Sequence, residues 1–269
     1  MSAIRTLHTK EITMNTASRT PRTIVITGGS RGIGYGIATC FARLGERIAI
    51  LDVDGASAAQ AARTLEAAGA GPSRGIACDI TQRAQVESAL AEVDATMDGT
   101  DVLINNAGIC PFIEVMELDA KTWQRTLDVN LTGAFTCTQV AARGMITRGR
   151  GGRVVFVTSL AENVTGPAQV DYGASKAGMR MTMVGFATAL GRHGITCNAV
   201  APGMIMTDMT SHHWSKPGPA AEIKQRVPVG RIGTPEDVGH AAVFLASAGA
   251  AYVNGITVRV DGGHQAVCA

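Results

Sequence analysis

Short apolar segments alternate with longer amphipathic ones along most of the chain, and this alternation limits the possible folds more than any other feature. Seven segments are short and rich in β-branched residues, at residues 23–27, 47–51, 75–78, 102–104, 154–157, 195–200 and 256–260. Helical patterns separate them, roughly at residues 83–97, 120–147, 172–192 and 235–246, after two earlier helices that end near Leu44 and Gly69. Strands that alternate with helices form a parallel sheet covered on both faces.

The turn after the first apolar segment favours an open sheet over a closed barrel, which would need eight repeats. Residues 27–34 read TGGSRGIG, with the spacing G-x-x-x-G-x-G. Glycines let a backbone approach a pyrophosphate, and the start of the next helix offers N–H groups to it. The spacing is neither G-x-G-x-x-G nor a Walker loop, because Ile37 and Tyr35 stand at the required positions. A purely structural turn is the alternative. We predict an α/β fold, a Rossmann-like doubly wound parallel sheet of about seven strands with helices on both faces.

Composition and charge indicate the class of protein. The 269 residues are 46% hydrophobic and carry a net charge of only +2, so the composition indicates neither nucleic acid nor an anionic membrane as a binding partner. No apolar run reaches the roughly 18–20 residues of a membrane span. The six cysteines form no C-x-x-C pair, which favours reduced thiols in a cytoplasmic protein and no metal site. We expect a flexible N-terminal tail at residues 1–21, with no secretory signal, and one catalytic domain at residues 22–269.

Asp52 bears on the choice of dinucleotide. It ends the second apolar segment, where an acid accepts hydrogen bonds from the adenosine ribose and repels a 2′-phosphate. A solvated loop acid is the alternative, and Asp54 is a nearby example. Arg31 favours NADP instead, since a basic side chain in the turn could pair with a 2′-phosphate. We predict NAD, with NADP possible.

Tyr172 and Lys176 are candidates for proton transfer. Four residues apart, they would share one face of a helix. A nearby ammonium favours the tyrosinate, so we expect Lys176 to lower the pKa of Tyr172 from about 10 toward that of a useful general acid or base. Ser159, at the end of the fifth apolar segment, adds a hydroxyl that would polarise a carbonyl. Taken singly, such pairs are usually surface contacts.

Taken together, these features resemble the short-chain dehydrogenase/reductase family, of the NAD-preferring type with a Tyr-x-x-x-Lys motif. The resemblance rests on the turn at residues 27–34, Asn105-Asn106-Ala107-Gly108, Asn130, Ser159, Tyr172-x-x-x-Lys176 and Pro202-Gly203, in this order and at these separations. It covers about residues 22–263, and no catalytic position departs from the family pattern.

The resemblance implies a role for each matching residue. Tyr172 would exchange a proton with the substrate oxygen, and Ser159 would hold that oxygen. Lys176 would bind the nicotinamide ribose, and Asn130 would support a water relay from it. The implied cofactor-binding set is Gly28, Ser30, Arg31, Gly32, Ile33, Gly34, Asp52, Asp79, Ile80, Asn106, Ala107, Gly108, Tyr172, Lys176, Pro202, Gly203, Ile205 and Thr207. Members are commonly homotetramers, with the helices near residues 120–147 and 172–192 at the main interface.

The substrate is less clearly specified. Candidate contacts are Cys110, Phe112, Ser159, Ala161, Glu162, Gln169, Tyr172 and Trp214. Trp214 lies in residues 204–233, a polar stretch that breaks the strand–helix rhythm and that we interpret as a substrate loop. An ionisable Glu162 suits a polar substrate better than a lipid.

We therefore expect an enzyme that interconverts a secondary alcohol and a ketone, or a hemiacetal and a lactone, on a sugar, polyol or sugar acid. A 3-oxoacyl-carrier-protein reductase that uses NADP is the alternative, although Asp52 counts against it. A non-catalytic dinucleotide sensor would be expected to lack Tyr172 or Lys176.

Overall fold

The computed structural model describes residues 20–207 and 226–267, and these residues build one seven-stranded parallel sheet. The strand order is β3-β2-β1-β4-β5-β6-β7, so the direction of winding reverses between β1 and β4. The strands are β1 (Thr23–Thr27), β2 (Arg47–Asp52), β3 (Arg74–Ala77), β4 (Val102–Asn105), β5 (Gly152–Val157), β6 (Ile195–Pro202) and β7 (Thr257–Val260). The predicted α/β fold is therefore confirmed, with strand ends shifted by a residue or two.

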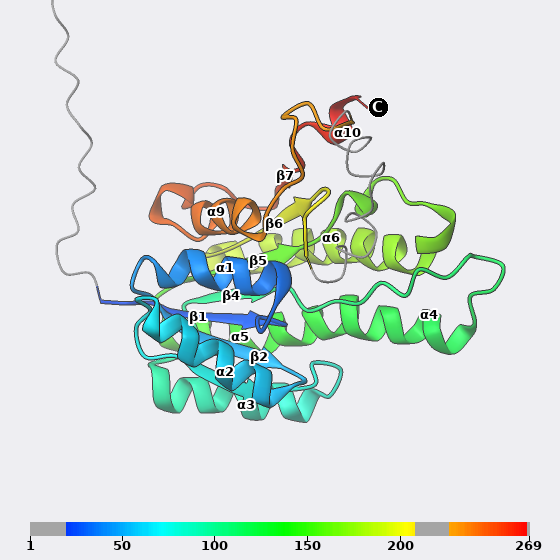
Figure 1. The fold of residues 1–269 in the computed structure, drawn as a ribbon. Coiled ribbons are helices and arrows are strands. Elements are labelled where there is room, and N and C mark those ends of the chain that lie inside the picture. The colour runs from blue at the N-terminus through cyan, green and yellow to red at the C-terminus, as the bar shows by residue number, and fades with distance from the viewer. Residues whose placement is uncertain (1–19, 208–225, 268–269) are drawn as a thin grey trace, which may run out of the picture.

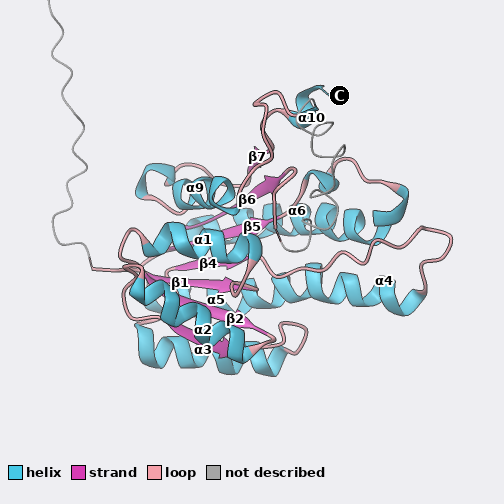
Figure 2. Ribbon diagram, in the orientation of Figure 1, coloured by secondary structure: helices cyan, strands magenta, loops and turns pink. Residues whose placement is uncertain are grey.

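Helices cover both faces of the sheet (Figures 1 and 2). One face carries α1 (Gly32–Ala42), α2 (Gly55–Ala67) and α9 (Pro235–Leu245), and the other carries α3 (Arg83–Met97), α5 (Ala134–Arg148) and α6 (Val170–Leu190). Successive residues of a strand point to opposite faces, so Phe156 packs in the cluster under α5 and α6 and Val155 in the cluster under α1 and α9. This two-sided burial explains why the strands are continuously apolar.

The helix expected at residues 120–147 is two α-helices joined by a π-helical segment. α4 (Ala120–Leu127) leads into η1 (Asp128–Gly133), and α5 follows. The sequence prediction took residues 120–147 as one regular helix and so missed the added residue of this π-helical turn. The helix expected at residues 172–192 starts at Val170 and ends at Leu190. Shorter helical turns are η2 (Leu160–Glu162), η3 (Pro167–Gln169), η4 (Gly191–His193), η5 (Ala248–Ala250) and α10 (His264–Val267).

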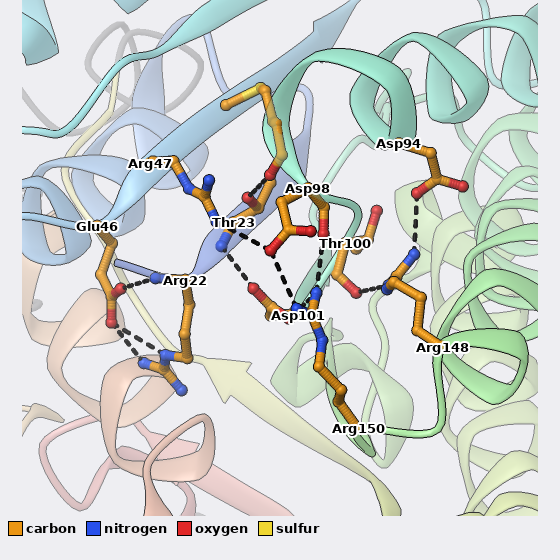
Figure 3. A network of polar contacts seen from close by, with 11 residues as sticks. Arg22, Thr23, Glu46, Arg47, Asp94, Asp98, Thr100, Asp101, Arg148 and Arg150 are labelled. Atoms are coloured by element: carbon orange, nitrogen blue, oxygen red, sulfur yellow. Dashed lines mark hydrogen bonds and ion pairs between the residues drawn. The ribbon is translucent and has the colours of Figure 1, made fainter. Parts of the chain in front are cut away.

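Charged residues join the amino-terminal ends of the strands (Figure 3). The backbone and guanidinium of Arg22 donate to Glu46, whose side chain is fully buried. Thr23 N donates to Asp101 at 2.9 Å, and Arg150 lies 3.6 Å from the same residue. These contacts tie together the segments that enter β1, β2, β4 and β5.

Two predicted segments lie wholly or mostly outside the described residues. They are the N-terminal tail at residues 1–21, of which only 20 and 21 are described, and the middle of the proposed substrate loop, which includes Trp214. The two ends of that loop are described, and Ile205 pairs with Gly233 in a parallel bridge. No helix of residues 20–207 or 226–267 is long and apolar enough to cross a membrane.

Candidate active site

The carboxyl ends of the strands open into a cavity of about 1190 Å³. Most of the residues predicted to bind a dinucleotide line it: Gly28, Arg31, Gly32, Ile33, Asp52, Asp79, Ile80, Asn106, Ala107, Gly108, Pro202, Gly203, Ile205 and Thr207. Predicted catalytic and substrate residues line the same cavity: Cys110, Phe112, Ser159, Ala161, Gln169, Tyr172 and Lys176. Ser30, Gly34, Asn130 and Glu162 are absent from its wall. The cavity lies where ligands bind in open α/β sheets.

The glycine turn is packed too closely for side chains. Gly28 has φ +62°, and a Cβ there would lie 2.9 Å from Ala107 Cα. A Cβ at Gly34 would lie 2.3 Å from the Gly28 carbonyl oxygen, so Gly34 supports the turn from behind the cavity wall. Asn106 Nδ2 donates to the carbonyl oxygens of Thr27 at 3.0 Å and Gly28 at 2.8 Å. The turn is therefore held by the loop after β4, and bare backbone faces the cavity.

Asp52 stands at the carboxyl end of β2, in the cavity wall. Its Oδ2 accepts a hydrogen bond from Ser30 Oγ at 2.5 Å, and its Oδ1 accepts one from Asp54 N at 3.2 Å. The Ser30 side chain thus faces the Asp52 carboxylate, which explains why Ser30 is not among the residues that line the cavity. Arg31, the next residue, is exposed and lines the cavity. Asp52 is therefore held in place at this end of the cavity, with a cation on the turn beside it.

Tyr172 and Lys176 share one face of α6, as their spacing predicted. Lys176 Nζ lies 5.5 Å from the centre of the Tyr172 ring and donates to the Val157 carbonyl oxygen at 2.8 Å. Ser159, which follows β5 after one residue, lines the cavity with them, and its Oγ accepts from Ala161 N at 3.1 Å. The strand end and the helix thus bring a hydroxyl, a phenol and an ammonium together.

The predicted lowering of the Tyr172 pKa is wrong in this structure. Burial raises the pKa of Tyr172 to about 12, although a hydrogen bond with Ser159 acts in the other direction. Burial also lowers the pKa of Lys176 to about 8. Attraction between the two groups alone would lower the pKa of Tyr172, but the cost of removing both groups from water is larger here.

Asn130 lies behind the cavity wall, within η1, and is fully buried. Its Oδ1 accepts from Ile109 N at 2.8 Å, and its Nδ2 donates to Ile109 O and to Ser175 Oγ, each at 2.9 Å. A Cβ placed on Gly108 would lie 3.2 Å from Asn130 Oδ1 and 3.5 Å from Lys176 Nζ. Asn130 therefore fixes the loop after β4 next to Lys176, and Gly108 leaves the space between them open.

Cys110, Phe112 and Gln169 form the outer part of the cavity wall near Tyr172. Gln169 Nε2 donates to Cys110 Sγ at 3.4 Å, and burial raises the pKa of that thiol. Phe112 has φ +57°, a left-handed conformation that costs free energy in a bulky residue, and its side chain is 43% exposed. These side chains offer both apolar surface and hydrogen-bonding groups to a ligand.

The structure does not place Glu162 in the cavity. The η2 turn after Ser159 directs its side chain inward, where Oε1 lies 3.9 Å from Arg180 Nε on α6. The side chain is 2% exposed, and burial raises the pKa of its carboxyl group. The direction of a side chain in a single 3₁₀ turn depends on tertiary contacts, so the expected substrate contact was wrong.

Sequence reasoning missed His264, which also lines the cavity. It stands four residues after Val260, where β7 ends, and the rule that ligands gather at carboxyl ends of strands could have pointed to it. Within the described residues no group of three His, Cys, Asp or Glu side chains could hold a metal ion.

The fold and this cavity define an enzyme that binds a nicotinamide dinucleotide, NAD(P), and acts on CH–OH groups. The chain belongs to the short-chain dehydrogenase/reductase family. A family model described as Enoyl-(Acyl carrier protein) reductase matches residues 28–265.

Curated relatives and solved structures align over most of the chain. An L-rhamnose 1-dehydrogenase (NAD(P)(+)) of Azotobacter vinelandii is 39% identical over 246 residues, covering 90% of this chain and 96% of the relative. A galactitol 2-dehydrogenase of Agrobacterium fabrum is 37% identical over 251 residues, covering 89% and 96%. The crystal structure of a gluconate 5-dehydrogenase from Burkholderia cenocepacia, in complex with NADP and tartrate, has a TM-score of 0.86 and 34% identity, covering 92% of this chain and 97% of that chain.

Proposed function

We propose that this enzyme oxidises a secondary alcohol to a ketone, or a hemiacetal to a lactone, on a sugar, polyol or sugar acid, and that it uses NAD. The observation that carries the chemistry is the meeting of Ser159, Tyr172 and Lys176 in one cavity with the glycine turn. The substrate class is supported by the relatives, which are named for L-rhamnose, galactitol and gluconate. The hydrogen-bonding groups of Ser159 and Gln169 in the wall suit a hydroxylated ligand.

The residues of this chain divide the work between proton transfer and orientation. Tyr172 takes the hydroxyl proton of the alcohol, and Ser159 holds the same oxygen by a hydrogen bond. Lys176 places a positive charge under the phenol and binds the ribose of the cofactor, and Asn130 supports a water relay from it. The nicotinamide supplies the hydride acceptor. The pKa of Tyr172 is raised even with Lys176 Nζ 5.5 Å from its ring, so a further positive charge in the cavity is needed for Tyr172 to act as a base near neutral pH.

The proposed preference for NAD rests on Asp52. A ribose with free hydroxyls can donate to this carboxylate, whereas a 2′-phosphate would meet like charge at the same place. Ser30 already donates to Oδ2 and so fixes the carboxylate at the end of β2.

One alternative has an observation in its favour. Arg31 lines the cavity, where it could pair with a 2′-phosphate, and the matching family model is described as a reductase of acyl-carrier-protein substrates. An NADP-dependent 3-oxoacyl-carrier-protein reductase would use the same Ser159, Tyr172 and Lys176 in the reverse direction.

We further propose a homotetramer in the cytoplasm. Large apolar side chains are exposed on the outer helices, among them Phe135 of α5 (41%) and Met181 of α6 (57%). The rings of Phe135 and Phe186 are 5.6 Å apart, so they join α5 and α6 into one apolar surface of the kind that self-association buries. The described cysteines are free, which suits a reducing compartment. Light scattering of the purified protein tests the assembly.

Steady-state assays decide between the substrate classes. L-rhamnose, galactitol, D-gluconate and a 3-oxoacyl thioester are each offered with NAD or NADP, or with the reduced cofactor for the thioester. The proposal expects turnover of at least one of the first three with NAD, and a Tyr172→Phe variant excludes contaminating activity. Turnover of the thioester alone would establish the alternative.

A further inference from the structure

His264 belongs to the substrate end of the cavity. It follows β7 through the turn Asp261-Gly262-Gly263. A Cβ on Gly203 would lie 2.6 Å from Asp261 Cβ and 3.5 Å from Leu160 Cδ1, so Gly203 packs between this turn and the residue after Ser159. Since His264 also lines the cavity, it stands on the Ser159 side, away from Asp52 and the adenosine end.

The turn holds the His264 backbone firmly. The two carboxylate oxygens of Asp261 accept hydrogen bonds from Gly263 N and Gln265 N, each at 2.9 Å, and His264 N donates to Asp261 O at 3.1 Å. Gly262 has φ +61°, and Val229 N donates to its carbonyl oxygen at 3.1 Å. A ring carried on such a turn has a fixed origin, as a specific contact requires.

The ring itself is oriented by one nitrogen. His264 Nδ1 lies 3.2 Å from the carbonyl oxygen of Arg226. A carbonyl oxygen only accepts hydrogen bonds, so Nδ1 carries the proton of the neutral imidazole and Nε2 is left as an acceptor. Among the residues that the structure describes, no group pairs with His264 Nε2.

We propose that His264 Nε2 accepts a hydrogen bond from a substrate hydroxyl other than the one that is oxidised, and so selects polyhydroxylated substrates. The inference rests on the proposed function, because it names a second hydroxyl on the substrate of that reaction. Ser159 and Tyr172 hold the reacting oxygen, and His264 holds the substrate farther along its carbon chain. A simple alcohol with a single hydroxyl cannot make this contact.

Two substitutions of His264 test the roles of its two ring nitrogens separately. The amide nitrogen of His264→Asn can replace Nδ1 and keep the contact with Arg226 O, but this variant has no atom at the Nε2 position. His264→Gln places its amide at the Nε2 position and loses the contact with Arg226 O. The matched control is His240→Asn, at an exposed histidine of α9 outside the cavity.

The assay compares the best of L-rhamnose, galactitol and D-gluconate with cyclohexanol, all with NAD. We expect His264→Asn to raise the KM of the polyhydroxylated substrate about fivefold, on the scale of one hydrogen bond, with the KM of NAD unchanged. His264→Gln should recover most of that loss, and both variants should change the KM of cyclohexanol much less than that of the polyhydroxylated substrate. Equal effects on both alcohols, or no effect of His264→Asn, would overturn the inference.

A second measurement does not depend on the substrate. Nitrogen NMR of the free enzyme should show the neutral His264 ring protonated on Nδ1, and protonation on Nε2 instead would contradict the proposed acceptor. If the wild-type enzyme oxidises cyclohexanol but none of the polyhydroxylated probes, the proposed substrate class fails, whatever the tautomer. The two failures are therefore distinguishable.

Discussion

Ser30 Oγ donates to Asp52 Oδ2 at 2.5 Å, so the hydroxyl of the glycine turn holds the carboxylate that ends β2. A fixed carboxylate discriminates more sharply than a mobile one, because it cannot turn away from a phosphate. We expect kcat/KM with NAD to exceed that with NADP at least tenfold, which is about 1.4 kcal/mol.

Asp52→Ala should reduce the ratio of kcat/KM for NAD to that for NADP. Ser30→Ala should reduce this ratio less, because the Asp52 carboxylate remains and loses only its hydrogen bond with Ser30 Oγ. Arg31→Ala should widen the gap by removing the cation that favours NADP. Assays with both cofactors check this prediction. A wild-type enzyme that prefers NADP would mean that Arg31 outweighs Asp52.

Tyr172→Phe should lower turnover at least a hundredfold, the scale of a lost general acid or base. The ring remains, so the dissociation constant of NAD, measured by fluorescence titration, should change little. Lys176→Ala should weaken NAD binding as well as turnover, because the ammonium has two roles. Near-normal turnover in Tyr172→Phe would refute the proposed mechanism.

The low pKa of Lys176 predicts how stability depends on pH. Between the folded value of about 8 and the unfolded value of about 10.5, the unfolded chain binds more protons than the folded one, so stability rises with pH. We expect the free energy of unfolding of the wild type, relative to Lys176→Met, to rise by up to about 3 kcal/mol across this window. Urea denaturation at pH 7.5, 9 and 10.5 measures it, and a difference independent of pH would show that Lys176 is not desolvated.

Glu46 should matter for stability and not for catalysis. Its side chain is fully buried and pairs with Arg22 at 2.8 Å, at the amino ends of the strands. Removing one partner of a buried pair costs about 3 kcal/mol or more, so Glu46→Ala should lower the free energy of unfolding by that amount.

The matched control is Asp98→Asn, whose side chain is 58% exposed beside Arg150 and whose loss of charge should lower the free energy of unfolding much less. Denaturant titration gives both values, and kcat should not change in either variant. A loss of kcat in a folded Glu46→Ala protein would contradict this separation.

Cys110 should be the described cysteine that reacts most readily with N-ethylmaleimide, because Cys40, Cys78, Cys137 and Cys197 are buried. Burial raises the pKa of the Cys110 thiol, so its reaction should be slow at pH 7 and should accelerate as the pH rises toward and beyond 9. Peptide mass spectrometry identifies the modified residue. Modification of Cys137 before Cys110 would contradict the arrangement of the cavity wall.

Local chemistry made much of this site predictable from the sequence. The glycine turn is one continuous segment with its own steric requirements, and Tyr172 and Lys176 lie one helical turn apart. The doubly wound parallel sheet followed from the alternation of strands and helices and from the first turn, but the order of the strands was not predicted. Elements whose geometry is set by distant contacts were missed. Glu162 is directed by α6, and His264 reaches the cavity only because β7 lies beside β6.

The π-helical segment Asp128–Gly133 sets the phase between α4 and α5. An α-helix turns by about 100° per residue, so deleting one residue there would restore regular winding but rotate α4 by that angle relative to α5. Thr126, which now donates to Asp171 Oδ2 at 2.7 Å, would turn away from α6, while Asn130 or its replacement would leave Ile109. A point substitution in this region would disturb one contact at a time. A change in the length of the segment would break the Thr126–Asp171 and Asn130–Ile109 contacts together.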